Sequence, residues 1–169
     1  MRRRNWIVGL VVLGAIGWYL FRPELLFVNK RVNESLTAQA PAQAAGSDAV
    51  PVAVLAGSFH SVAHETKGRA TVHRLSDDTR VLRLTEFATS NGPDVRVYLV
   101  AAADAADDAT VKQAGFVELG KLKGNQGDQN YAIPSDLDLD KYRAVTIWCR
   151  RFGVNFGTAP LTLASRSGA

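Results

Sequence analysis

The sequence has 169 residues, of which 47% are hydrophobic, and a formal net charge of +4. This length allows one compact domain with an additional segment. The charge is uneven, because residues 1–50 carry a net +3 and residues 51–169 carry a net +1. A nearly neutral domain lacks the basic surface typical of nucleic-acid binding, so we expect no nucleic-acid partner.

The N-terminal segment has the features of a membrane anchor. Arg2–Arg4 precede an uncharged run from Trp6 to Phe21 that has aromatic residues near both ends. Aromatic rings favour the membrane interface and arginines favour the cytoplasmic side, although the run is shorter than the ~20 residues of a usual span. We predict an anchor over residues 1–32 with an N-terminal transmembrane helix. This single-pass arrangement places the N-terminus in the cytoplasm and the C-terminal domain outside it, in an extracytoplasmic compartment (periplasmic or extracellular).

A cleaved signal peptide is the alternative interpretation of the N-terminus. Ala38-Gln-Ala40 and Ala42-Gln-Ala44 have the small residues of a cleavage site, but they lie far beyond Phe21. The following residues, 33–52, are small and polar and bury too little apolar area to fold, which predicts a flexible linker. The remaining sequence is divided into a domain at 53–165 and a disordered tail at 166–169.

The domain has the sequence pattern of β-strands. Apolar and polar residues alternate with a period of two, and Gly-, Pro-, Asn- and Asp-rich turns separate the runs. This pattern predicts an all-β fold, an antiparallel β-sandwich, with one short helix within residues 104–114. The predicted strands are Arg69–Leu75, Thr79–Glu86, Val95–Val100, Gly115–Leu122, Ala144–Cys149 and Leu161–Ala164.

Cys149 is the only cysteine in the sequence. Exported proteins normally pair their cysteines in disulfides, so a lone thiol needs an explanation. Alternation with Val145 and Ile147 favours a buried position, where a thiol packs as a small hydrophobe. Arg150 and Arg151 follow directly, and nearby cations favour the reactive thiolate. The residues therefore allow either an inert core cysteine or an active thiol or metal ligand.

Other candidate sites are weaker. His64 and Cys149 are possible metal ligands by residue type, but the histidines are scattered and lack the close spacing of a metal site. The segment 119–131, rich in Gly, Asn, Asp and Gln, is either a tight connection or a polar binding loop, for example for Ca²⁺. We find no hydrolase or nucleotide-binding motif, so the sequence does not predict an enzyme, and it identifies no cofactor.

Several motifs together resemble one protein family, the DM13 domain, over about residues 54–164. They include Gly57-Ser-Phe59, Leu84-Thr-Glu-Phe87, Asn91-Gly-Pro-Asp-Val95, Leu119-Gly-Lys-Leu-Lys-Gly-Asn125, Gly127-Asp-Gln-Asn-Tyr131 and Val145-Thr-Ile-Trp-Cys149. The resemblance implies an exported or membrane-anchored electron-transfer module, here a single domain, with Cys149 as the proposed redox group. The family-motif residues, whose roles the resemblance does not define, are His64, Asp94, Asn125, Asp128, Asn130 and Trp148.

Two functions follow from this resemblance and from the residues themselves. In the first, Cys149 of a membrane-tethered domain exchanges electrons with a separate redox partner protein, because the chain has no second cysteine. In the second, the domain is a non-catalytic extracytoplasmic binding or adhesion β-sandwich, and Cys149 is a buried structural residue.

Overall fold

The computed structural model describes residues 2–21, 28–36 and 51–164. The helices within these ranges are α1 (Arg2–Phe21) and α2 (Asp108–Ala114). The strands are β1 (Val52–Ser58), β2 (His60–Ser61), β3 (Lys67–Arg74), β4 (Arg80–Ala88), β5 (Val95–Val100), β6 (Phe116–Lys121), β7 (Gln129–Ile133), β8 (Ala144–Cys149), β9 (Val154–Pro160) and β10 (Thr162–Leu163).

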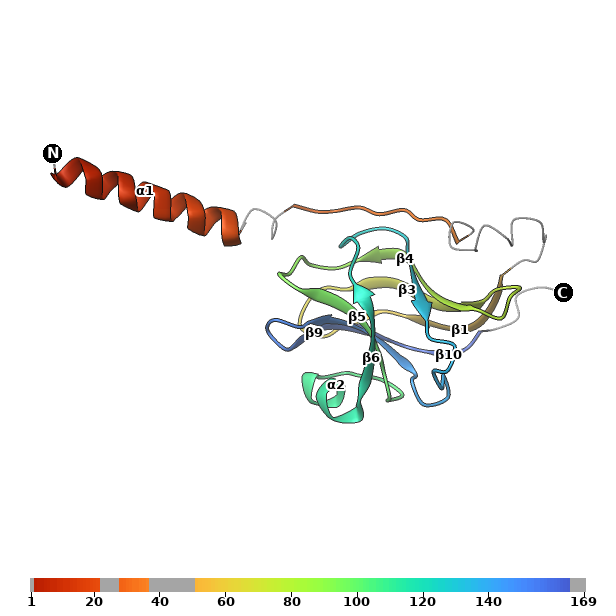
Figure 1. Ribbon diagram of the computed structural model, residues 1–169. Helices are drawn as coiled ribbons and strands as arrows, with labels where there is room; N and C mark the ends of the chain where they lie inside the picture. The colour runs from red at the N-terminus through yellow and green to blue at the C-terminus, as the bar shows by residue number, and fades with distance from the viewer. Residues whose placement is uncertain (1, 22–27, 37–50, 165–169) are drawn as a thin grey trace.

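The strands form two antiparallel sheets of five strands each (Figure 1). Sheet A has the order β10-β1-β3-β4-β7, and sheet B has the order β2-β9-β8-β5-β6. Neighbouring strands pair antiparallel throughout both sheets. The predicted antiparallel β-sandwich is therefore confirmed.

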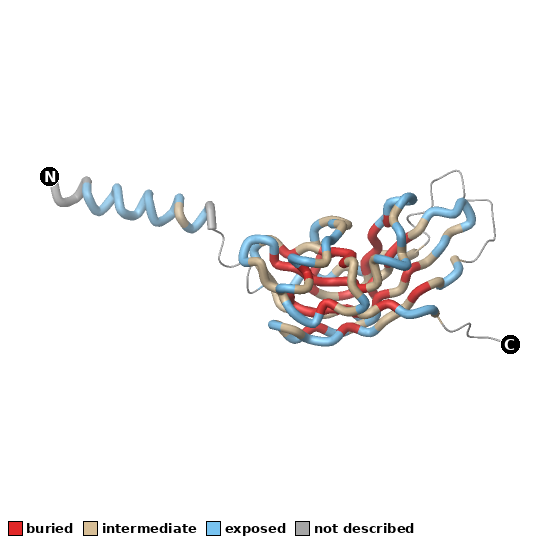
Figure 2. The backbone as a smooth tube through the Cα atoms, turned by 90° about the horizontal axis from the view of Figure 1, so that it is seen from below, coloured by how far each residue is buried: buried red, intermediate tan, exposed pale blue. Residues whose placement is uncertain are grey.

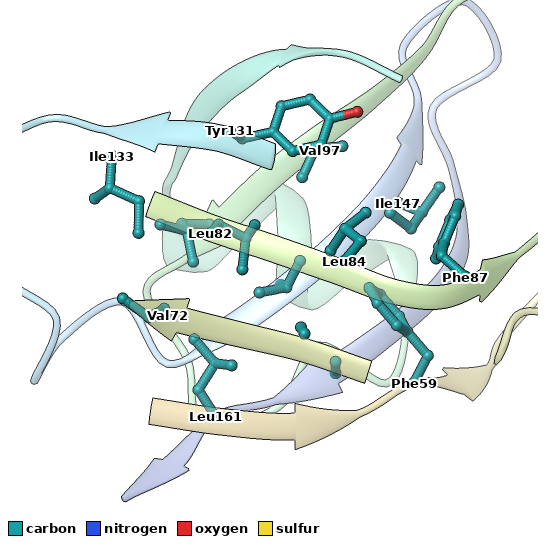
Figure 3. Close-up of a cluster of buried hydrophobic side chains, with 14 of the residues drawn as sticks. Phe59, Val72, Leu82, Leu84, Phe87, Val97, Tyr131, Ile133, Ile147 and Leu161 are labelled. Atoms are coloured by element: carbon teal, nitrogen blue, oxygen red, sulfur yellow. The ribbon is translucent and has the colours of Figure 1, made fainter. Parts of the chain in front are cut away.

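The main hydrophobic core lies between the two sheets. Leu82 and Leu84 from sheet A and Val97 and Ile147 from sheet B belong to one cluster of buried side chains (Figure 3). Buried residues are concentrated in the sandwich, whereas the side chains along α1 are mostly exposed (Figure 2). Each large apolar side chain in this core stabilises the fold by about 1.5–3 kcal/mol relative to leaving it exposed.

Strand β8 is buried along its whole length. It is the middle strand of sheet B, and one of its faces contributes Val145, Ile147 and Cys149 to the main core. Its other face contributes Ala144 and Trp148 to a second cluster, to which α2 adds Val111. A strand covered on both faces has little polar alternation, which explains its nearly continuous apolar sequence.

Most of the predicted elements are present. The six predicted strands correspond to β3, β4, β5, β6, β8 and β10, and the short helix corresponds to α2, where Asp107 Oδ1 accepts a hydrogen bond of 2.6 Å from Thr110 N–H. Strands β1, β2, β7 and β9 were not predicted. Strand β9 contains Gly157 and Pro160, and β7 begins with two polar residues that are completely buried, so neither has the usual apolar alternation.

Helix α1 forms where the sequence predicted a transmembrane helix. It has 20 residues, and Trp6, Leu10 and Leu13 are among its exposed apolar side chains. Within the described parts of the chain, no helix is long and apolar enough to cross a membrane.

Residues 28–36, which we call the strap, lie in an extended conformation against the domain and form the orange segment of Figure 1 that follows the grey trace after α1. The N–H groups of Val32 and Glu34 donate to the carbonyl oxygens of Gln126 and Asp128, both at 2.9 Å. Within residues 33–52, for which the sequence predicts a flexible linker, Asn33, Glu34 and Ser35 form hydrogen bonds with the domain, and Val52 begins β1. Residues 37–50 and the predicted tail at 166–169 lie outside the described residues.

Candidate functional site

Cys149, the predicted redox residue, is the last residue of β8 and is completely buried. Its backbone neighbours across sheet B are Val95 on β5 and Val154 on β9. Its side chain belongs to the main core cluster together with Val145, Ile147 and Phe156. A thiol in this position packs as a small hydrophobe and cannot meet a partner protein unless the surrounding structure opens.

Asp94 holds the turn that follows Cys149. Its carboxylate accepts hydrogen bonds from Arg96 Nε at 2.6 Å and from Arg150 Nε at 2.9 Å, and its carbonyl oxygen accepts from Arg150 N–H at 2.9 Å. The hydrogen bond from Arg96 is the largest influence that lowers the pKa of Asp94, and Arg150 adds to it. Asp94 therefore fixes the start of β5 to the end of β8, where Cys149 lies.

Glu118 of β6 extends this network of charged residues. It pairs with Arg96 Nη1 at 2.5 Å and with Arg150 Nη1 at 3.8 Å. The carboxylates of Asp94 and Glu118 therefore pair with the same two arginines, Arg96 and Arg150. The arginines after Cys149, which in the sequence favoured a reactive thiolate, are engaged in part with these carboxylates, while the thiol lies in the core.

Trp148 lies in the second hydrophobic cluster with Tyr98 and is 6% exposed. The ring centroids of Trp148 and Tyr98 are 6.4 Å apart, and the Lys112 ammonium lies 5.7 Å from the Trp148 ring. Burial raises the pKa of the Tyr98 phenol, with a further contribution from the negative charge of Glu118. The Trp-Cys motif is therefore divided between two environments, one on each face of β8.

His64, the weak metal-ligand candidate, is half-buried and packs against Phe156, with ring centroids 3.9 Å apart and ring planes tilted by 41°. His60 pairs instead with Asp104 at 3.0 Å, so the histidines do not converge on one site. Nowhere in residues 2–21, 28–36 and 51–164 do three or more His, Cys, Asp or Glu side chains lie close enough to hold a metal ion.

Asn125, Asp128 and Asn130, the three polar family-motif residues of the loop before β7 and its start, all contact the strap. Asn125 Oδ1 accepts from Lys30 N–H at 2.7 Å, and Asn130 Nδ2 donates to the Ser35 carbonyl at 2.9 Å. The Asp128 carbonyl accepts from Glu34 N–H, while the Asp128 carboxylate accepts from Arg83 Nη2 at 2.8 Å. The segment has the features of a tight connection, since Gly120 and Gly127 have positive φ angles and the Gln129 side chain bonds the backbone of Gly124. It also forms hydrogen bonds with the strap.

Glu34 supplies the charged contact between the strap and the loop. Its two carboxylate oxygens accept hydrogen bonds from Lys123 Nζ at 2.8 and 2.9 Å, and one also accepts from Asn130 N–H at 2.8 Å. Burial alone would raise the pKa of Glu34, but these hydrogen bonds and the charges of Lys123 and Arg83 lower it overall. Glu34 is therefore held in its ionised form.

Sequence reasoning missed the contact between the strap and the loop, because Glu34 lay in a predicted linker and no local pattern distinguishes Arg83 and Lys123 from the other basic residues. The one available signal was the concentration of Gly, Asn and Asp in the loop.

A cleft of about 430 Å³ lies beside the contact between the strap and the loop, and is lined by Val28, Asn91, Asp94, Lys121 and Asn125 among others. Asn91 Nδ2 binds the N-terminal end of the strap, because it donates a hydrogen bond to the Val28 carbonyl at 3.0 Å.

Comparison with protein families gives a match over residues 58–161 to a family described as "Electron transfer DM13". The matched range is more than half of the chain and contains all strands from β2 to β9, with Asp94, Asn125, Asp128, Asn130, Trp148 and Cys149. No match to the chain was found among curated proteins or among solved structures.

Proposed function

This chain belongs to the DM13 family, and on that premise we propose that its β-sandwich serves an electron-transfer system outside the cytoplasm as a binding module. In this proposal Cys149 is a structural residue of the core. The family description supports the connection with electron transfer, and the position of the thiol supports the non-catalytic role.

The burial of Cys149 is the observation that carries this proposal. The residue has no exposed surface, and its cluster consists of apolar side chains such as Val145, Ile147 and Phe156. Thiol–disulfide exchange requires a thiolate that can approach a sulfur atom of the partner in line. The closed core excludes the partner from the Cys149 sulfur atom.

Alkylation of the folded full-length protein tests the proposal. A small neutral reagent such as iodoacetamide is expected to modify Cys149 slowly in native buffer and rapidly in denaturant, as measured by intact mass. Cys149→Ala removes the reactive group and is expected to leave binding of the redox partner system intact. Rapid alkylation of the native protein, at the rate of the denatured chain, would contradict the structural role of the thiol.

Redox chemistry at Cys149 is the second candidate function, and the position of this residue at the end of β8 favours it. The next residues, Arg150, Arg151 and Phe152, form an exposed turn, and the Phe152 side chain is 70% exposed. Opening of this turn alone would bring the thiol toward the solvent without unfolding either sheet.

The chemistry of this candidate needs a second protein. The Cys149 thiolate would attack a disulfide of the partner, forming a mixed disulfide and releasing one partner thiolate. A second thiol must then attack the mixed disulfide to complete the two-electron exchange, and this chain has no other cysteine. For a trapping test, one of the two partner cysteines is replaced and the other is activated as a mixed disulfide with thionitrobenzoate. If this function is correct, attack by Cys149 would release thionitrobenzoate and give a covalent complex, and the Cys149→Ala variant would give none.

We also propose that residues 1–32 attach the protein to a membrane. The arginines at positions 2–4, the uncharged run that follows, and the exposed apolar side chains of α1 support attachment. These features support attachment both for a helix that crosses the membrane and for one that lies on its surface. The experiment therefore has to distinguish an integral from a peripheral membrane protein.

Fractionation of cells that express the full chain makes this distinction. An integral anchor resists alkaline carbonate and is released only by detergent, whereas the variant Leu10→Arg/Leu13→Arg is expected to move to the soluble fraction. Digestion of the domain by protease added outside intact spheroplasts would support the extracytoplasmic location. A wild-type protein found in the soluble fraction without detergent would contradict attachment.

A further inference from the structure

The strap pairs with the loop before β7 as an added β-strand would. The backbone carbonyl of Gln126 accepts a hydrogen bond from Val32 N–H at 2.9 Å, and the backbone N–H of Gln126 donates one to the Lys30 carbonyl at 3.2 Å. Arg31 and Gln126 form a parallel bridge, and Glu34 N–H continues the pairing to Asp128. Proteins that recognise extended peptides use this geometry, in which backbone hydrogen bonds supply affinity and side-chain contacts supply specificity.

Buried polar side chains of the domain fix the two ends of the strap. Asn125, which is 4% exposed, binds Lys30 N–H and also donates to Asn29 Oδ1 at 2.8 Å. Asn130, which is completely buried, donates to the Ser35 carbonyl at 2.9 Å. These amides would lose hydrogen-bond partners if the strap left, and an unsatisfied buried polar group is costly.

The centre of the contact recognises a carboxylate. The Glu34 carboxylate accepts hydrogen bonds from Lys123 Nζ and from the backbone N–H of Asn130. The backbone carbonyl of Glu34 accepts a further hydrogen bond from Arg83 Nη1 at 2.9 Å. Hydrogen bonds in which a partner is charged are roughly twice as strong as neutral ones. A peptide with a neutral or basic side chain at this position would leave Lys123 without its carboxylate.

Gly124 leaves the space through which the strap passes. A Cβ atom added to this residue would collide with the Lys30 carbonyl oxygen and would lie 2.9 Å from Val32 Cγ2. The three atoms nearest to that Cβ all belong to the strap, and the φ angle of Gly124 lies outside the positive range that disfavours other residues. The closest clashes of an alanine at position 124 are thus with the strap.

We propose that the groove formed by Arg83 and residues 123–130 is a binding site for an extended peptide with a carboxylate side chain, and that the strap is its resident ligand. The site is specific in three ways: strand-like backbone pairing, a carboxylate at the position of Glu34, and glycine at position 124. This inference does not depend on a redox role or on membrane attachment.

Occupation of the groove changes how far the domain extends from α1. With the strap bound, only residues 22–27 lie between Phe21 and the docked Val28, a maximum extended distance of about 24 Å. With the strap released, the connection runs from Phe21 to Val52, with a maximum of about 100 Å. A partner peptide that displaced the strap would therefore occupy the groove and, at the same time, allow the domain to move farther from α1.

A synthetic peptide of residues 28–36, labelled with a fluorophore, tests the site on the full-length protein. In the wild type the strap is covalently linked to the groove and competes at high effective concentration, so weak or no binding is expected. Glu34→Lys in the protein weakens the strap through repulsion from Lys123 and Arg83, so this variant is expected to bind the peptide at least about tenfold more tightly. Fluorescence anisotropy measures both affinities.

Three controls make the result specific to the groove. Glu65→Lys makes the same charge change at an exposed position, where the Glu65 carboxylate lies 3.9 Å from Lys67 Nζ, and should bind like the wild type. The double variant Glu34→Lys/Gly124→Ala should not bind, because its groove is blocked. A peptide with Glu34→Lys should not bind to any of these proteins. Equal binding of the peptide by all variants, or no binding by Glu34→Lys, would overturn the proposal.

Hydrogen exchange provides a measurement that is independent of added peptide. In the wild type, the amides of Val32 and Glu34 should be protected, because both donate to the loop. Gly124→Ala should remove this protection and increase trypsin cleavage after Lys30 and Arg31, while amides of the β4 and β8 strands stay protected. Retained protection of Val32 in the Gly124→Ala variant would show that the strap is not bound as proposed.

Discussion

Trp148 and Cys149 are neighbours in β8, yet their side chains belong to two separate hydrophobic clusters. Cys149 packs between the sheets, and Trp148 packs on the outer face of sheet B beside Tyr98 and α2. Alternate residues of a strand point to opposite faces, so the indole ring and the thiol lie on different sides of the backbone. The Trp-Cys motif therefore contributes to both hydrophobic clusters, one on each face of β8, the middle strand of sheet B.

Replacement of Cys149 tests its role in the core. Cys149→Ala should lower the free energy of unfolding by about 1–2 kcal/mol because it leaves a cavity in a completely buried cluster. Cys149→Ser should cost about 1 kcal/mol more, since its hydroxyl would be buried among apolar side chains. Urea denaturation followed by circular dichroism measures both. Stability unchanged in both variants would show that the thiol does not pack as the structure indicates.

Removal of the Asp94 carboxylate tests whether it keeps Cys149 covered. Asp94→Ala should lower stability by about 1 kcal/mol and increase the alkylation rate of native Cys149, because Arg150, the residue after Cys149, loses one of its two carboxylate partners. Asp94→Asn keeps one oxygen acceptor and should have a smaller effect on the alkylation rate. An alkylation rate in Asp94→Ala equal to that of the wild type would mean that this network does not control access to Cys149.

Two aromatic residues on either side of Cys149 provide a matched pair for the second cluster. Trp148→Ala should destabilise the fold by about 3 kcal/mol, because its buried ring packs on Tyr98 and beneath Lys112. Phe152→Ala should change stability by less than about 0.5 kcal/mol, because that ring is exposed. Thermal unfolding of the two variants measures the difference, and similar losses in both would contradict the assigned positions.

The strap should detach in acid. The pKa of bound Glu34 is lowered overall, so its contribution to strap binding is complete above the ordinary pKa of about 4.3 and is lost as the pH falls through the lowered value. The protection of the Val32 amide, corrected for intrinsic exchange, should therefore decrease below about pH 4. Glu34→Gln should show weaker protection at neutral pH and little change over this range. Wild-type protection that follows the same pH dependence as Glu34→Gln would show that Glu34 is not the group responsible.

The order of short strands and turns in the sequence was sufficient to predict the sandwich. Strands such as Val95–Val100 and Ala144–Cys149 carry their own signal, because apolar side chains repeat at the spacing that a buried sheet requires. Strands β7 and β9 were missed since their residues are stabilised by partners distant in the chain. Asn130 of β7, for example, is completely buried, and its side-chain oxygen accepts a hydrogen bond from Arg83 Nη1, 47 residues earlier in the chain.

The sequence also indicated that Cys149 faces the core, because alternation with Val145 and Ile147 is a local property of one strand. It could not show that Asp94 holds the turn after Cys149, since the two residues are on different strands that meet only in the folded sheet. The role of Asn125, Asp128 and Asn130 was likewise beyond a local pattern. Their partners lie more than ninety residues earlier, at positions whose polar composition predicted a linker.

Local patterns by themselves thus determined the β-sandwich, the family resemblance and the inward direction of the only thiol, because side-chain periodicity depends on neighbours in the sequence. Only the tertiary structure decided that the thiol is fully enclosed and that the polar loop binds residues 28–36. These features depend on hydrogen bonds and close backbone approach between distant segments, such as Glu34 with Lys123 and Lys30 with Gly124, which no local composition encodes.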